Sequence, residues 1–347
     1  MAGMHDAPLI SPENKDADAD VFAELPKITL FEELGATVAQ AGSPADLTAA
    51  VSAHLQRLVD DHVVYAELRF TPASTQLAAE EALAAAVAGL DVEGIDARII
   101  VTAERGAQDP AAVTQLARLT VAQHSGKIVG FELAADNGQE GQDDQAAAPL
   151  AGFAEAFQAL REAYVPFAVR LTAAGEAEDI GQALQAGATR LTLTAGIIDD
   201  FSATLEGIEP GRVSAWVRDR HILLDAAPRF EVDRGEIEEL VDHPLPLLQQ
   251  LGFNCAVSSG SWETGSMTEQ LSALAETFGY GLEEFFDLSV NAIEHSFATQ
   301  EDRQHLLETV FLPAYEELSD AEFAEDHHEH DGAEDIPGAA ETPGEEV

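Results

Sequence analysis

The sequence predicts an α/β fold, a (β/α)8 TIM-like barrel that forms a single domain. Short apolar, β-branched runs alternate along the chain with longer segments rich in Ala, Leu, Glu and Gln, and eight such runs can be counted. Near-continuous apolar runs are typical of parallel strands buried on both faces, and eight strand–helix units close into a barrel. The rival fold, a doubly wound open sheet, would need a glycine-rich phosphate turn after an early strand, and neither GxGxxG nor GxxxxGKS/T occurs.

The individual elements follow from this alternation. The predicted strands are short and rich in Val, Ile, Phe and Ala, and they lie at residues 28–30, 63–70, 97–103, 128–134, 166–171, 190–194, 221–226 and 253–258. The predicted helices between them include residues 47–59, 78–89, 110–123, 153–163, 176–186 and 244–251. The last of these begins with Pro244 after His243, a position where proline fits a helix.

Both ends of the chain differ from the region between them. Residues 1–24 carry six acids and one base, and residues 319–347 carry eleven acids with neither Lys nor Arg. Acidic segments without apolar periodicity cannot bury enough surface to order themselves. We therefore expect a disordered N-terminal arm at 1–24, the barrel at 25–318 and a disordered acidic tail at 319–347, with the tail as a candidate interaction arm.

Composition excludes several classes of protein. The chain has 347 residues with 17 Lys and Arg against 64 Asp and Glu, a net charge of −47, so neither nucleic acid nor an anionic membrane is expected as a partner. No run of about 18 apolar residues occurs, and the acidic start does not resemble a signal peptide, which predicts a cytoplasmic protein. The single cysteine, Cys255, excludes an intrachain disulfide.

In a barrel of this kind, active-site residues lie at the carboxyl ends of the strands. None of the eleven histidines of the chain falls at these ends. No GxSxG turn surrounds the serines that follow the eighth strand, so a serine nucleophile is not predicted. The candidates for a ligand pocket at these ends are Phe31, Glu33, Ala135, Asp136, Ala173, Leu193, Ser258, Gly260 and Ser261, and Glu176 also follows the fifth strand.

Seven stretches stand in the order and spacing of a known family. They are VYAELRFTP (64–72), VGFELAAD (129–136), LTAAGE (171–176), HPLPLLQQLG (243–252), GSMTE (265–269), FGYG (278–281) and NAIEHSF (291–297). Together they make the chain similar to the adenosine deaminase family, and in particular to its actinobacterial members, over about residues 25–307. The resemblance implies a barrel of the metal-dependent hydrolase superfamily with zinc at the strand ends.

The resemblance also implies where the zinc ligands should stand, and this chain departs from that pattern. Phe31 and Glu33 take the places of the two histidines in the family's H-x-H pair. Ala173 takes the place of the histidine in H-A-G-E, while Gly260 and Ser261 stand where the family has paired aspartates, one on zinc and one on the attacking water. Since a hydrolytic zinc site needs three or four N, O or S ligands, we expect no zinc cofactor.

The remaining family positions are mostly changed as well. Leu193 replaces the histidine of G-H-G that helps to activate the water, and Ala135 replaces a glycine whose backbone contacts the purine. Only the general acid–base glutamate, Glu176, is retained from the catalytic set.

These departures lead to two hypotheses about function. In the first, the chain is a pseudoenzyme that binds a purine nucleoside or another small ligand, pairs with an authentic deaminase, or associates with itself. In the second, it is an active purine nucleoside deaminase that converts adenosine to inosine. The second hypothesis requires either a metal site reassembled from Glu33, Asp136 and Glu176 or metal-free chemistry at Glu176.

Two structural expectations complete the prediction. Glu67 and Arg69 point the same way from one strand, so we expect them to form a buried ion pair in the barrel wall. Residues 34–63 leave room for one helix and a loop, without the extra helices that cover the substrate in the family. We therefore expect a barrel mouth that is open to water.

Overall fold

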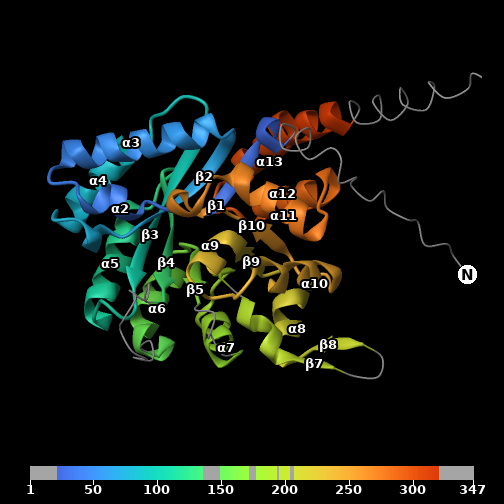
Figure 1. Ribbon diagram of the computed structural model, residues 1–347. Coiled ribbons are helices and arrows are strands. Elements are labelled where there is room, and N and C mark those ends of the chain that lie inside the picture. Colours follow the sequence, from blue (N-terminus) through green and yellow to red (C-terminus); the bar gives the residue numbers. More distant parts are fainter. Residues whose placement is uncertain (1–21, 136–148, 172–176, 194, 204–206, 320–347) are drawn as a thin grey trace, which may run out of the picture.

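The computed structural model describes residues 22–135, 149–171, 177–193, 195–203 and 207–319 (Figure 1). Their main feature is one parallel sheet, in the order β10-β9-β6-β5-β4-β3-β2-β1-β11. Its strands are β1 (Lys27–Glu33), β2 (Val63–Phe70), β3 (Asp96–Glu104), β4 (Ile128–Ala134), β5 (Phe167–Arg170), β6 (Arg190–Thr192), β9 (Leu223–Ala226), β10 (Cys255–Val257) and β11 (Gly260–Ser261). Each strand except β11 overlaps a predicted one, β11 begins two residues after the predicted strand at 253–258, and the predicted α/β fold is confirmed.

The two ends of the sheet are parts of one barrel strand. β10 pairs with β9, β11 pairs with β1, and only Ser258 and Ser259 separate them along the chain. The sheet order therefore closes on itself through the eighth strand of the barrel, which changes its pairing partner at the two serines.

Helices cover the outside of the sheet and connect its strands. They are α2 (Gly35–Ala39), α3 (Pro44–Asp60), α4 (Ala79–Ala88), α5 (Pro110–Gln123), α6 (Ala154–Glu162), α7 (Ala177–Ala186), α8 (Arg212–Asp219), α9 (Pro228–Asp233), α10 (Leu245–Gln250), α11 (Met267–Phe278), α12 (Leu282–His295) and α13 (Gln300–Leu306). Short 3-10 turns η1 to η5 occupy Pro72–Ser74, Leu150–Phe153, Ala195–Asp200, Leu240–Asp242 and Trp262–Thr264, and a π-helical turn η6 occupies Leu307–Phe311.

Local sequence signals explain where several helices begin. The Ser43 side chain accepts a hydrogen bond from the Asp46 N–H, and Asp109 caps the helix that begins at Pro110 in the same way. Helix α11 begins with a capping box between Ser266 and Glu269. An antiparallel hairpin that the sequence analysis did not predict, β7 (Phe201–Ala203) with β8 (Ile208–Pro210), lies outside the barrel sheet (Figure 1).

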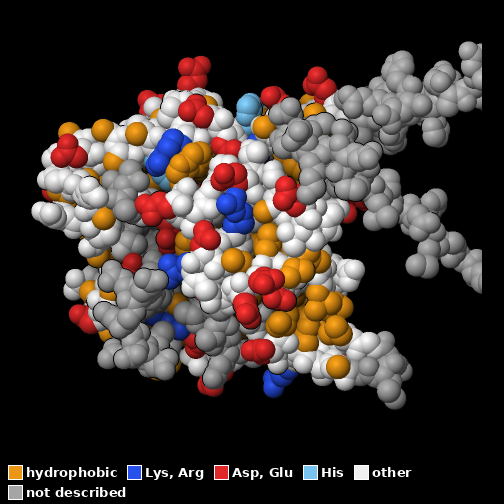
Figure 2. Space-filling view, viewed as in Figure 1, with side chains coloured by type: hydrophobic (Ala, Val, Ile, Leu, Met, Phe, Trp, Pro, Cys, Tyr) orange, Lys and Arg blue, Asp and Glu red, His pale blue; other side chains and the backbone are white. Residues whose placement is uncertain are grey.

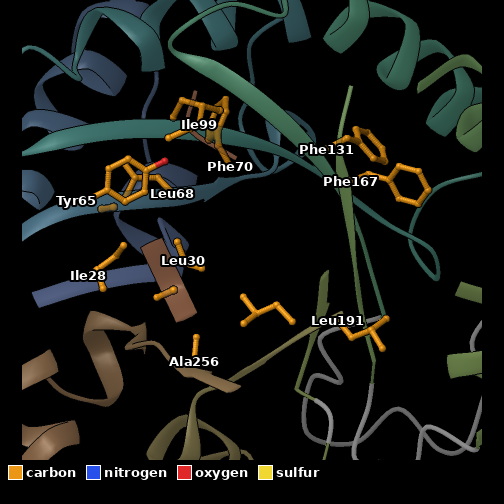
Figure 3. Close-up of a cluster of buried hydrophobic side chains, with 14 of the residues drawn as sticks. Ile28, Leu30, Tyr65, Leu68, Phe70, Ile99, Phe131, Phe167, Leu191 and Ala256 are labelled. Carbon is orange, nitrogen blue, oxygen red and sulfur yellow. The ribbon is translucent and has the colours of Figure 1, made fainter. Parts of the chain in front are cut away.

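The hydrophobic core joins the strands to the surrounding helices. Figure 3 shows part of it, in which Tyr65 and Phe70 of β2, Ile99 of β3, Phe131 of β4 and Phe167 of β5 are buried. Within the described ranges, no helix is long and apolar enough to cross a membrane. The division into an arm at 1–24, a barrel at 25–318 and a tail at 319–347 stays a prediction, because 1–21 and 320–347 lie outside the described residues.

A buried ion pair fastens the barrel to the end of α12. The Arg190 and Glu67 side chains are both fully buried, and Arg190 Nη1 lies 2.6 Å from Glu67 Oε2. Arg190 also donates to the carbonyl oxygen of His295 (2.9 Å), and the Phe297 N–H donates to Glu67 Oε1 (2.5 Å). The expected Glu67–Arg69 pair is therefore wrong: Glu67 pairs across the barrel with β6, and Arg69 pairs with Glu132 at 3.2 Å.

The buried pair yields a stability prediction. Replacing one member leaves the other charge uncompensated in the interior, so Glu67→Gln should lower the free energy of unfolding by about 3–5 kcal/mol. The exposed Arg218–Asp219 pair is the matched control, and Asp219→Asn should cost no more than about 1 kcal/mol. Urea unfolding of the three proteins measures both values. Similar losses of unfolding free energy in the two variants would show that the buried pair contributes no more to stability than the exposed pair.

Candidate functional site

Most of the predicted site residues lie at the carboxyl ends of the barrel strands. Seven of the ten predicted residues can be placed there, whereas Asp136, Ala173 and Glu176 lie outside the described residues. Phe31 and Glu33 lie in β1, while Ala135 and Leu193 directly follow β4 and β6. The other three, Ser258, Gly260 and Ser261, lie in or beside the break in the eighth strand.

An apolar cluster fills the space between β1, β6 and β9. It consists of Phe31, Leu193, Ala227 and Phe230, which are each 0–3% exposed and pack separately from the main core. The rings of Phe31 and Phe230 meet edge to face, with centroids 5.4 Å apart and planes at 88°. These four side chains are shielded from solvent, but the expected open mouth stays a prediction, because 136–148 and 172–176, which follow β4 and β5, lie outside the described residues. Two helices, α2 and α3, also occupy the connection in which one helix was expected.

Two backbone features hold this cluster in place. Leu193 adopts a positive φ of 56°, a conformation that is uncommon for a residue with a side chain. Gly260 has φ 77°, and a Cβ atom on it would lie 2.5 Å from the Phe230 side chain. Gly260 is therefore the residue type that lets Phe230 pack against the eighth strand.

Arginine side chains flank Phe31. The Arg170 and Arg69 guanidinium carbons lie 5.1 and 5.8 Å from the centre of its ring. Arg170 hydrogen-bonds to the Glu33 carboxylate and lies 3.6 Å from Glu132, which also pairs with Arg69. Burial by itself lowers the pKa of Arg170, but the nearby carboxylates of Glu33 and Glu132 have the larger effect and raise it. For Arg69 the effect of burial is the larger one, and its pKa is lowered. The Glu33 carboxylate is therefore bound to a buried cation.

Ser258 joins the two sides of the barrel through its side chain. Its Oγ accepts hydrogen bonds from the N–H groups of Leu30 (2.9 Å) and Phe31 (3.1 Å) and donates to Asp225 Oδ1 (2.7 Å). Burial raises the Asp225 pKa to about 6, although Arg190, Arg69 and the Ser258 hydroxyl favour the charged form. Ser258 thus completes hydrogen bonding where the backbone ladder is broken.

Sequence reasoning missed a second polar group behind β1. Glu32 is fully buried, accepts a hydrogen bond from the Trp262 N–H (3.0 Å), and lies 2.8 Å from His54 Nε2. The Ser259 hydroxyl also hydrogen-bonds to Glu32. The signal was the alternation of the strand, because Glu32 must face away from Phe31 and Glu33, toward α3. Phe230 was missed too, although it stands four residues after the end of β9.

Metal-binding groups do not mark the described part of these strand ends. Among the described residues, no three or more His, Cys, Asp or Glu side chains form a group that could hold a metal ion. A cavity of about 480 Å³ lies between α3 and the start of α11. It is lined by Arg57, Asp60, Asp61, Trp262, Gly265, Ser266 and Glu269.

The raised pKa of Asp225 predicts a pH effect on stability. Because the folded chain holds this proton more tightly than the unfolded chain (ordinary pKa 3.8), its stabilising effect is complete at low pH and is lost as pH rises through about 6. The shift of about two pKa units corresponds to about 3 kcal/mol. Between about pH 4 and pH 7 the unsubstituted chain should therefore lose about 3 kcal/mol relative to Asp225→Asn.

Urea unfolding at several pH values measures this difference. Asp287→Asn, at an exposed position of α12, is the matched control for removing one acid from a highly acidic chain. A constant offset between Asp225→Asn and the unsubstituted chain across the whole range would contradict the prediction.

Comparison with known proteins identifies the family. The family model described as adenosine deaminase matches residues 14–312. Adenosine deaminase from Mycobacterium ulcerans is 28% identical over 301 residues, covering 82% of this chain and 80% of the relative.

Solved structures share the fold at lower identity. A zinc-bound amidohydrolase from Burkholderia ambifaria is 17% identical with a TM-score of 0.74, covering 91% of this chain and 96% of its own. The Arabidopsis protein ADAL, complexed with IMP, is 15% identical with a TM-score of 0.70, covering 85% and 98%. The sequence match extends over most of the chain and the fold agrees with it, so this chain belongs to the adenosine deaminase family.

Proposed function

We propose that this chain is a pseudoenzyme of the adenosine deaminase family, which has lost the zinc site and acts by binding a partner. The observation that carries the proposal is the buried cluster of Phe31, Leu193, Ala227 and Phe230 at the strand ends. Phe31 and Leu193 stand at two positions where the family resemblance implies histidines, and both side chains pack against hydrocarbon there.

The residues at these positions do not fit zinc. The ion is held by nitrogen, oxygen or sulfur atoms at about 2.0–2.3 Å, and the side chains of Phe31 and Leu193 have none. Glu33 has suitable oxygens, but Arg170 already binds its carboxylate. Turning Glu33 toward a metal would leave a buried guanidinium with less compensating charge, which is unfavourable. The donor set therefore disfavours a reassembled metal site that includes Glu33.

The serines support the same proposal. The Ser258 hydroxyl accepts hydrogen bonds from two backbone N–H groups of β1 and donates one to Asp225. Its hydrogen-bonding capacity is therefore used in joining the eighth strand to β1 and β9. The Ser261 side chain accepts from the Glu263 N–H at the start of η5. Both serines therefore have structural partners, and neither has a histidine base bonded to it in the described residues.

An active purine nucleoside deaminase is the second candidate. It is favoured by the match to adenosine deaminases at 28% identity and by the retained Glu176. Its metal site would need Asp136 and Glu176 together with Glu33, or Glu176 would have to act without a metal. A glutamate alone is a poor base for forming hydroxide from water at neutral pH, which is why hydrolases of this type use a metal.

Zinc content and activity together separate the two candidates. We expect about zero zinc per chain by elemental analysis, and no conversion of adenosine to inosine above the rate without protein. The protein should carry His327→Gln, His328→Gln and His330→Gln, so that these tail histidines cannot bind metal. About one zinc per chain, with conversion that disappears in Glu176→Gln, would overturn the pseudoenzyme proposal. Conversion that is unaffected by Glu176→Gln would indicate contamination.

A purine ligand is tested separately. Because the apolar cluster fills the strand ends, adenosine, inosine and IMP at millimolar concentration should leave the melting temperature of the chain unchanged. A ligand at 100 times its Kd would add about 2.7 kcal/mol and raise the melting temperature by several degrees. Such a rise would favour ligand binding over a partner role. The inferred partners are then an authentic deaminase or a second copy of this chain, which sedimentation of the mixed and isolated proteins distinguishes.

A further inference from the structure

Exposed apolar side chains lie away from the strand ends. Ile198, Ile208 and Trp216 are 39%, 46% and 54% exposed, and they are three of the five large exposed hydrophobic side chains among the described residues. They lie on η3, β8 and α8, and α8 contacts both other elements. Asp200 fastens η3 to α8 by accepting hydrogen bonds from the Ser214 N–H (2.7 Å) and Oγ (2.8 Å). Figure 2 shows apolar side chains gathered over the region of α8 and α10.

Two arginines share the exposed side of α8 with Trp216. Arg212, Trp216 and Arg220 follow one another at intervals of four residues, which places them along one face of the helix. All three are exposed, and the Arg220 guanidinium lies 4.8 Å from the Trp216 ring centre. We call Ile198, Ile208, Arg212, Trp216 and Arg220 the α8 face.

The charge of this region is unusual for the chain. Segment 207–220 carries three arginines against two acids, Glu209 and Asp219, in a protein of net charge −47. The adjacent η3 adds the exposed Asp199 and the half-buried Asp200, whose carboxylate accepts hydrogen bonds from Ser214, so the positive charge is local to α8. Asp219 is paired with Arg218, at 3.2 Å. Arg212 and Arg220 therefore offer positive charge beside an apolar surface, a combination suited to an acidic segment that also carries apolar residues.

We propose that the α8 face binds residues 320–347 of the same chain. This segment carries eleven acids and neither Lys nor Arg, and Phe323 and Ile336 supply apolar side chains. Its 28 residues can span about 90 Å when extended, whereas a domain of this size has a radius of gyration of about 19 Å. The segment can therefore reach the α8 face from residue 319.

Because residues 320–347 belong to the same chain as the α8 face, a weak contact between them is sufficient for binding. Exposed arginine–carboxylate pairs contribute little individually and are screened by salt, but a linked segment has an effective concentration in the millimolar range. The contact should therefore form at low ionic strength and be lost at high ionic strength. It goes beyond the proposed function, because it depends on neither zinc nor a purine.

Quenching of Trp216 fluorescence by acrylamide tests the proposal in the full chain. Trp262→Phe leaves Trp216 as the single tryptophan. At low salt we expect the quenching constant to be about half that of a chain in which the acids of 320–335 are changed to Asn and Gln, and 0.5 M NaCl should remove the difference. Arg212→Gln should raise quenching with the native tail and have no effect with the neutralised tail.

The controls separate docking from other changes. Arg220 is left intact because it contacts Trp216 directly, and Arg118→Gln, at an exposed position on α5, is the matched charge control. Hydroxyl-radical footprinting with mass spectrometry resolves Trp216 from Trp262 in the unsubstituted chain, and so gives the same comparison if Trp262→Phe fails to fold. Equal exposure of Trp216 with native and neutralised tails would overturn the proposal. Protection that disappears on dilution, together with a dimer in sedimentation, would overturn the assignment to the same chain in favour of a second copy.

Discussion

Closure of the barrel at Ser258 is the constraint on which the strand ends depend. The eighth strand pairs with β9 through β10 and with β1 through β11, so its backbone cannot serve both neighbours at the break. The Ser258 hydroxyl replaces the missing ladder by binding two N–H groups of β1 and the Asp225 carboxyl. One side chain thereby fixes β1, β9 and the eighth strand relative to one another and satisfies two backbone N–H groups of β1.

The apolar cluster is a consequence of that closure. Ser258 holds the N–H of Phe31, which directs the Phe31 ring into the same space as Phe230 and Leu193. Gly260, two residues after Ser258, leaves the room that Phe230 needs. Phe31, at a position where the family resemblance implies a zinc-binding histidine, is therefore part of the packing that closes the barrel. Restoring a single ligand there would leave its apolar neighbours around it.

The sequence predicted the barrel well because its signal is local and repeated. The helix at Pro110–Gln123 has its predicted bounds, and every predicted strand overlaps or adjoins an observed one. Side-chain partners were harder to predict, since Glu67 pairs with Arg190, 123 residues away, and not with Arg69 on its own strand. The β7–β8 hairpin was missed because its strands are three residues long and largely exposed, so they lack a strong apolar pattern. The predicted roles of Asp136, Ala173 and Glu176 stay predictions.

The arginines of the chain are divided between the barrel interior and the surface. Arg69, Arg170 and Arg190 are buried in the barrel, and each is paired with a carboxylate there. Three of the 17 basic residues of this strongly acidic chain are therefore not available at its surface. On such a surface, exposed arginines close together are distinctive, because most approaching segments of the chain are repelled by the surrounding acids. An acidic segment therefore binds most favourably where exposed arginines reduce this repulsion, as Arg212 and Arg220 do on the α8 face.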